Sequence, residues 1–157
     1  MKSSKPLLLL IAAICIALLG AALYLQIVEE MQPCPLCIIQ RYLFCVIALV
    51  CLIFAFLPRG ATRIGAGLGV LAAIGGAATA GWHLWVKAHP GVSCGIDPLE
   101  TSLNHIAPAN MFPLMFQADG LCAAPLPPLF GLSIPQWSLI WFVILGLALA
   151  RVLFKRR

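Results

Sequence analysis

Two cysteines separated by two residues, Cys34 and Cys37, are the residues of this sequence best suited to redox chemistry. They lie in a short polar stretch between two long apolar runs. A C-x-x-C pair can close an easily reduced disulfide when both sulfurs lie near the start of a helix, where the helix N-terminus also stabilises a thiolate. Arg41, one helical turn after Cys37, adds a positive charge nearby. The pattern therefore predicts a dithiol that transfers electrons.

The same spacing is compatible with two other uses, a structural disulfide and one half of a zinc site. A c-type haem attachment is excluded, because Ile38 stands where that motif requires histidine. The position beside Arg41, at the edge of an apolar run, favours the redox interpretation.

A second pair, Cys94 and Cys122, encloses a long segment that is rich in proline. Two interpretations of a disulfide between them stay open. It is either an inert staple for that segment or a second exchangeable disulfide, which accepts electrons from a soluble dithiol and passes them to Cys34 and Cys37. Zinc held by all four cysteines is a third alternative. It fits an oxidising compartment less well, because thiols there form disulfides, and we expect no metal site.

Two polar side chains beside apolar runs are further candidates. An arginine at the membrane edge is energetically costly and is therefore a functional candidate, although Arg41 can also extend to the interface. His83 stands near the end of the third apolar run, where it can hydrogen-bond a quinone carbonyl or pack as a neutral imidazole. The remaining cysteines lie inside apolar runs and are expected to act as small buried hydrophobic residues: Cys15, Cys45 and Cys51.

These candidates must be positioned by membrane helices. The chain has 157 residues, of which 62% are hydrophobic and only 10% charged, and its mean hydropathy is +1.04. This composition excludes a soluble domain and predicts an all-α membrane protein, a single four-transmembrane-helix bundle over residues 1–157. The expected spans are residues 6–28, 38–57, 64–86 and 137–154. The first apolar run is longer than the ~7–15 residues of a signal peptide, so we expect an uncleaved helix.

Small residues in the third span recur every four positions, which lets helix backbones approach closely in lipid. This stripe consists of Gly65, Gly69, Ala73, Ala77 and Gly81, with Ala72, Gly76 and Ala80 on an adjacent row.

The basic residues are distributed unevenly and predict the orientation. The net charge of +5 alone would be compatible with nucleic-acid binding, but eight of the ten basic residues lie at the termini or between the second and third spans. The positive-inside rule therefore places both termini in the cytoplasm, and the loops of about 29–37 and 87–136 outside it. We expect the lipid bilayer, and no nucleic acid, as the partner of this charge.

The longer loop carries its own signals. Asp97 is expected to cap a short helix that ends near Ile106, since proline and glutamate follow it at the favoured positions. An apolar patch over residues 111–116 is too short to span the bilayer. It is expected to rest on the bilayer surface, or alternatively to contact a partner protein.

Four motifs together resemble the DsbB (disulfide bond formation protein B) family, over essentially the whole chain. The motifs are Tyr24-Leu25-Gln26, Pro33-Cys34-Pro35-Leu36-Cys37 with Gln40-Arg41, Gly81-Trp82-His83-Leu84-Trp85, and Gly131-Leu132-Ser133-Ile134-Pro135-Gln136-Trp137. The resemblance implies a thiol:quinone oxidoreductase of the bacterial inner membrane. Such a protein reoxidises a periplasmic thioredoxin-fold oxidase of the DsbA type and passes the electrons to a membrane quinone, ubiquinone or menaquinone.

The resemblance also implies a role for each site residue. Cys94 is the sulfur that the partner's thiolate attacks, and Cys122 then attacks Cys34. Cys37 becomes the thiolate that faces the quinone. Arg41 would stabilise both that thiolate and the reduced quinone, and His83 is a second candidate for quinone binding.

Two functions from other classes are rivals. A metal-handling membrane protein would use the four cysteines as ligands and keep them as thiols. A structural membrane protein would contain two inert disulfides, and its function would not depend on Cys34 or Cys37.

Overall fold

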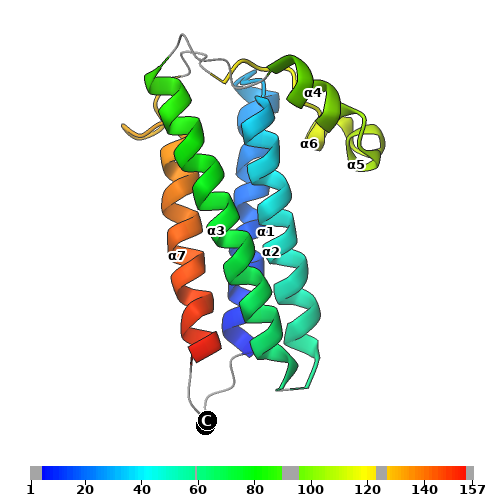
Figure 1. Cartoon of the computed structure of the whole chain (residues 1–157), viewed down its shortest axis with the longest axis vertical. Helices are drawn as coiled ribbons and strands as arrows, with labels where there is room; N and C mark the ends of the chain where they lie inside the picture. Colours follow the sequence, from blue (N-terminus) through cyan, green and yellow to red (C-terminus); the bar gives the residue numbers. More distant parts are fainter. Residues whose placement is uncertain (1–4, 59, 90–95, 123–126, 155–157) are drawn as a thin grey trace.

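The computed structural model describes residues 5–58, 60–89, 96–122 and 127–154. Four of its helices are long and apolar enough to cross a membrane (Figure 1). They are α1 (Lys5–Val28), α2 (Pro35–Phe56), α3 (Ala61–Ala88) and α7 (Ile134–Phe154). The predicted four-helix membrane bundle is confirmed. Helices α2, α3 and α7 begin earlier than their apolar runs, because their first turns contain polar residues or prolines that a hydropathy pattern assigns to loops.

The long helices pack in a fixed sequence of neighbours. Helix α1 packs on α2, α2 on α3, and α3 on α7, whereas α1 and α7 make little direct contact with each other. Buried side chains of both helices nevertheless belong to one core cluster, so the opening between α1 and α7 is confined to part of their length.

Close packing of α3 rests on its small residues, as the sequence predicts. A Cβ atom added at Gly76 would clash with the ring of Phe142, and one at Gly69 would approach a methyl group of Leu149 to 2.8 Å. At Gly81, by contrast, nothing lies within 4 Å, so the last member of the stripe does not serve helix packing. The glycines bring α3 and α7 close together only over the part of the bundle remote from the cysteine pair.

The remaining cysteines lie in or against this core. Cys15 and Cys51 are fully buried, and Cys45 is partly buried against the same cluster of apolar side chains. The predicted burial is confirmed for Cys15 and Cys51, and the inert role of all three stays a prediction.

The two ends of the bundle differ in what covers them. The start of α1, the end of α7 and the α2–α3 connection lie together at one end, and three short helices lie at the other (Figure 1). At the first end, the Arg63 guanidinium donates two hydrogen bonds to the Leu153 carbonyl, from Nε at 3.2 Å and from Nη2 at 3.0 Å. The start of the first span and the end of the last therefore share one side, as predicted, and the compartment on that side stays a prediction.

The short helices are α4 (Ile96–Asn104), α5 (Ala107–Met111) and α6 (Pro113–Phe116). Helix α4 matches the predicted loop helix, although it begins one residue before Asp97 and ends at Asn104. The apolar patch divides: Met111 and Phe112 are exposed, whereas Phe116 is buried and stacks on Tyr42 of α2, with ring centroids 4.4 Å apart. One part of the patch anchors the loop to the bundle, and the other part remains available for the bilayer surface or a partner.

Candidate active site

The start of helix α2 positions the C-x-x-C pair. Cys34 is the N-cap residue with an extended backbone, Pro35 occupies the first turn, and the Cys34 sulfur accepts a hydrogen bond from the Cys37 backbone N–H at 3.4 Å. The two Sγ atoms are 3.1 Å apart. Since a disulfide bond measures about 2.05 Å, closing it needs an approach of only about 1 Å. The predicted placement of both sulfurs at a helix start is confirmed.

The two sulfurs differ in environment. Cys34 is buried and donates its hydrogen to the Cys37 sulfur, and this hydrogen bond together with burial raises the pKa of the Cys34 thiol. Cys37 is only partly buried. In the reduced pair, Cys34 is therefore the sulfur that keeps its proton, and Cys37 is the more accessible of the two.

His83 of α3 lies buried against both sulfurs. Its Nε2 is 3.7 Å from Cys34 Sγ, and its Nδ1 is 4.0 Å from Cys37 Sγ. Nε2 also lies 3.2 Å from the Cys122 carbonyl oxygen, and Nδ1 lies 3.5 Å from Gln40 Nε2. One tautomer satisfies both polar contacts: Nε2–H donates to the carbonyl, and Nδ1 accepts from the Gln40 amide. The sequence predicted a polar role for His83 but gave no signal that it contacts the sulfurs.

Cys122 lies next to the C-x-x-C pair. It is buried and disulfide-bonded, and it packs in one cluster with Cys34, Leu36 and Val86. Cys94 lies outside the described residues, so its predicted pairing with Cys122 stays a prediction. Because the His83 imidazole contacts both Cys34 and the Cys122 backbone, the structure brings the second cysteine position to the first pair.

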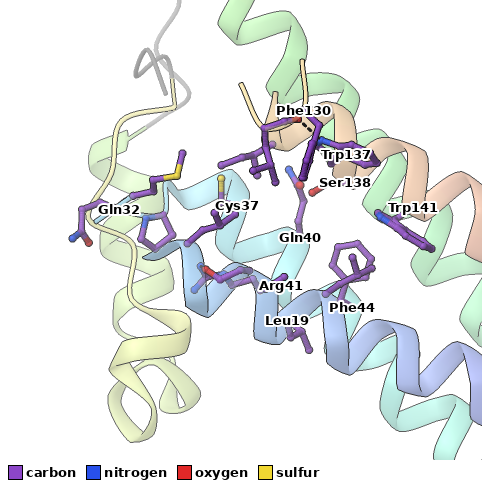
Figure 2. A pocket seen from close by; sticks show the side chains of 18 residues that line it. Leu19, Gln32, Cys37, Gln40, Arg41, Phe44, Phe130, Trp137, Ser138 and Trp141 are labelled. Carbon is purple, nitrogen blue, oxygen red and sulfur yellow. Dashed lines mark hydrogen bonds between the residues drawn. The ribbon is translucent and has the colours of Figure 1, made fainter. Parts of the chain in front are cut away.

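A cavity of about 310 Å³ opens beside Cys37 (Figure 2). Cys37, Gln40 and Arg41 of α2 line it together with Trp137, Ser138 and Trp141 of α7. The other walls come from α1, from the α1–α2 segment, from Phe44 of α2 and from the chain around the start of α7, namely Leu18, Leu19, Ala21, Ala22, Leu25, Met31, Gln32, Pro33, Leu129, Phe130 and Ile134. The cavity thus occupies the opening between α1 and α7, and His83 lies outside its lining.

Arg41 is held at the edge of this cavity by three acceptors. Its Nη1 donates to Gln26 Oε1 at 2.7 Å and to the Met115 carbonyl at 3.0 Å, and its Nη2 donates to the Ala22 carbonyl at 3.3 Å. The side chain is buried, so these contacts replace the water that a guanidinium requires. The contacts hold the guanidinium inside the protein, one helical turn from Cys37, so it does not extend to the interface.

Sequence reasoning assigned no function to Gln26, Gln40 or Ser138. Gln26 supports Arg41, Gln40 supports His83, and Ser138 supplies a hydroxyl to the cavity wall. The available signal was a polar residue inside an otherwise apolar span, which is unusual enough to mark a functional candidate.

The described residues contain one cluster of donor atoms with metal-ligand chemistry. Suitable atoms of Cys34, Cys37 and His83 lie within 4.8 Å of one another. The four-cysteine zinc alternative requires Cys122 as a thiolate, whereas Cys122 is disulfide-bonded. The arrangement therefore fits disulfide exchange better than a site of four thiolates.

Comparison with known proteins decides the family. Residues 4–152 match the family described as "Disulfide bond formation protein DsbB". The chain belongs to the DsbB family. A protein of Herminiimonas arsenicoxydans named "Disulfide bond formation protein B" is 55% identical over 157 residues, covering 100% of this chain and 99% of the relative. One of the same name from Cupriavidus metallidurans is 47% identical over 154 residues, covering 98% and 95%.

Membership of the DsbB family confirms the resemblance that the four motifs carry. It also establishes the broad function: the chain is a multi-pass membrane protein of disulfide bond formation, with the oxidoreductase chemistry that this implies. The C-x-x-C pair at the start of α2 is the described site with geometry suited to that chemistry.

Proposed function

We propose that this protein is a thiol:quinone oxidoreductase, which reoxidises a DsbA-type dithiol oxidase and passes the electrons to a membrane quinone. One observation carries the proposal: the Cys34–Cys37 pair lies between two different surroundings. Cys34 packs beside Cys122, whereas Cys37 lines the apolar cavity. A disulfide in this position can receive electrons on one side and release them on the other.

The thiol steps are disulfide exchanges, each of which forms one S–S bond and breaks another. The partner's thiolate attacks Cys94, forms a mixed disulfide and releases Cys122 as a thiolate. Cys122 attacks Cys34, so that the Cys34–Cys122 bond forms and Cys37 leaves as a thiolate. The partner's second thiol then releases Cys94, which attacks Cys122 and frees Cys34. Two electrons and two protons have moved from the partner to the Cys34–Cys37 pair.

The cavity fits a quinone. Its walls are largely apolar, as an aromatic ring with a polyprenyl tail requires, and polar groups of Gln40, Arg41 and Ser138 are available for the ring oxygens. A bound quinone supplies a two-electron acceptor that is regenerated in the membrane. The cavity is lined by α1 and α7, two helices that make little direct contact, so a lipid-soluble molecule could enter it between them from the membrane.

The chain's own residues prepare this transfer. Arg41 holds a fixed positive charge near Cys37 and near the position where negative charge develops on the acceptor. His83 contacts both sulfurs and is suited to take up or return the proton of a thiol during exchange. Its proposed quinone contact would require the ring to reach past Gln40, because His83 lies behind the cavity wall.

The proposed location is the bacterial inner membrane, with the active cysteines on the periplasmic side. Three basic residues at the opposite end of the bundle, Lys5, Arg63 and Arg151, support this orientation through the positive-inside rule. A periplasmic position also provides the oxidising compartment in which both disulfides persist.

Anaerobic reduction of ubiquinone and menaquinone analogues, followed optically, tests the function. Purified protein receives a reduced DsbA-type dithiol as donor. We expect turnover in the wild type and in the control Cys15→Ala, and none in Cys34→Ala or Cys94→Ala. If the wild type leaves the quinone oxidised while it binds zinc or retains four thiols, the metal-handling function is correct instead.

A further inference from the structure

The segment that carries Cys122 is fastened at its start by the side chain of Asn104, the last residue of α4. Asn104 Nδ2 donates to the Ala118 carbonyl at 3.1 Å, and the Ala118 N–H donates to Asn104 Oδ1 at 2.9 Å. The amide side chain thus makes the paired contacts of a short β-bridge with a residue that is fully buried. This ties the end of α4 to the chain that follows α6.

The same segment is fastened a second time, directly to the residue before Cys34. The backbone N–H groups of Asp119 and Gly120 both donate to the Pro33 carbonyl, at 3.1 and 3.0 Å. Gly120 lies so close that an added Cβ would clash with the Gln32 carbonyl oxygen and would be 3.1 Å from the Pro33 carbonyl carbon. Backbone atoms cannot move aside as a flexible side chain does, so this approach requires glycine.

These four hydrogen bonds, from Asn104 to Ala118 and from residues 119–120 to Pro33, form what we call the clamp. Pro33, which accepts two of these hydrogen bonds, directly precedes Cys34, and Gly120, which donates one of them, precedes Cys122 by two residues. Cys122 itself is buried in the cluster that contains Cys34, and His83 contacts both positions. The clamp therefore holds the backbone before Cys122 against the backbone before Cys34, although the two segments belong to different parts of the fold.

We propose that Asn104 and Gly120 are positioning residues for electron transfer between the two cysteine pairs. The inference rests on the proposed function. In the step they serve, the Cys122 thiolate attacks Cys34, the Cys34–Cys37 bond breaks, the Cys34–Cys122 bond forms, and Cys37 leaves as a thiolate. When the segment holds the attacking sulfur beside its target, the reaction does not have to wait for a mobile loop to find the right position, and it is therefore faster.

The chain supplies matched controls for both residue types. Asn110 belongs to the same loop as Asn104, but its side chain donates only to nearby carbonyls of His105 and Ile106, at 3.4 and 3.5 Å. For glycine, Gly60 at the opposite end of the bundle has nothing within 4 Å of the position that an added Cβ would take. Asn110→Ala and Gly60→Ala therefore change the same residue types without touching the clamp.

The experiment separates the two half-reactions. Oxidised full-length protein is mixed anaerobically with a reduced DsbA-type dithiol, quenched with acid, alkylated and mapped by mass spectrometry. We expect Asn104→Ala and Gly120→Ala to reduce the Cys34–Cys37 pair about tenfold more slowly, the loss expected from two neutral hydrogen bonds. Thiol should accumulate at Cys122 while Cys34 and Cys37 remain oxidised. Asn104→Asp, which keeps the acceptor for the Ala118 N–H, should fall between alanine and wild type.

The second half-reaction distinguishes positioning from a general structural role, because damage to the fold would slow it as well, whereas loss of positioning would not. Fully reduced protein is mixed with a quinone analogue, and formation of the Cys34–Cys37 disulfide is followed. Asn104→Ala should match the wild type here, because Cys122 takes no part and the partner of Asn104, Ala118, does not line the cavity. Gly120→Ala is judged on the first half-reaction, since its added Cβ meets Gln32 and Pro33, which also line the cavity. Equal slowing of both half-reactions, or unchanged transfer from Cys122, would overturn the positioning role. Failure of the wild type to pass electrons to Cys34 and Cys37 would instead overturn the proposed function itself.

Discussion

The two cysteine positions of this DsbB-family protein are held in different ways. Cys34 and Cys37 are both placed by the start of one helix, where Cys34 is the N-cap residue and a proline occupies the first turn. Their sulfur atoms lie 3.1 Å apart as a result. Cys122 follows no helix directly, and its segment is placed by hydrogen bonds to Asn104 and Pro33 from distant parts of the chain. The C-x-x-C pair is thus placed by local geometry, whereas the position of Cys122 depends on hydrogen bonds to distant parts of the chain.

The largest effect on turnover is expected when the Cys34–Cys37 pair, which the helix start places locally, is broken. Cys37→Ala is expected to abolish quinone-linked turnover, because no leaving thiolate and no new disulfide are available at that position. Disulfide exchange between the partner dithiol and the Cys94–Cys122 pair should continue, since neither of those sulfurs is changed. Optical quinone reduction measures the first effect, and non-reducing mass spectrometry of the alkylated protein measures the second. Normal turnover in this variant would eliminate the electron route.

The next largest effect is expected at Arg41. Arg41→Ala should lower quinone-linked turnover by about ten- to a hundredfold, the loss typical of one charge-assisted contact at a reacting site. Arg41→Lys should recover only part, since an ammonium group cannot contact Gln26, Ala22 and Met115 in the same planar geometry. Steady-state turnover against quinone concentration tests this. If both variants match the wild type, Arg41 serves only to anchor the loop.

The unequal environments of the two sulfurs predict unequal reactivity. The pKa of the Cys34 thiol is raised, so its thiolate fraction should remain low when the pH rises through ~8.5, the ordinary value for cysteine. Cys37, which is less buried, should be alkylated about tenfold faster in the reduced protein, in line with the dependence of attack on thiolate and access. Timed iodoacetamide labelling with peptide mapping measures the ratio. Preferential labelling of Cys34 would contradict this assignment.

The smallest effect is expected at Gln26, which acts through Arg41. Gln26→Ala should reduce turnover only a few-fold, because two carbonyl acceptors remain for the guanidinium. Gln26→Glu should keep the contact with Arg41 and retain activity closer to the wild type. The matched control is Gln136→Ala at the start of α7, whose side chain accepts only from Ser133 and so leaves Arg41 untouched. Loss of activity in Gln136→Ala equal to that in Gln26→Ala would indicate a general effect on stability.

Features set by neighbouring residues could be predicted from the sequence, whereas contacts between distant segments could not. The spans were predictable because an apolar run longer than the bilayer thickness has few alternatives, and the starts of α2 and α7 were missed because Pro35 and Pro135 open these helices. The stripe on α3 was predictable because its period is local, although Gly81 proved to face open space. The loop helix was predictable from its opening residues, but the burial of Phe116 against Tyr42 was not.

By itself, the sequence determined the four spans, the C-x-x-C pair at a helix start and the charge asymmetry, since each is a property of neighbouring residues. Tertiary structure alone decided that His83 lies against both sulfurs, that Gln26 holds Arg41, and that the cavity forms between α1 and α7. Those contacts join segments far apart in the chain, and no local period or motif specifies which distant side chain completes a hydrogen bond. Their physical cause is the packing of α2 against α3, which brings His83 to the sulfurs, and of α1 against α2, which brings Gln26 to Arg41. The limited contact between α1 and α7 leaves room for the cavity.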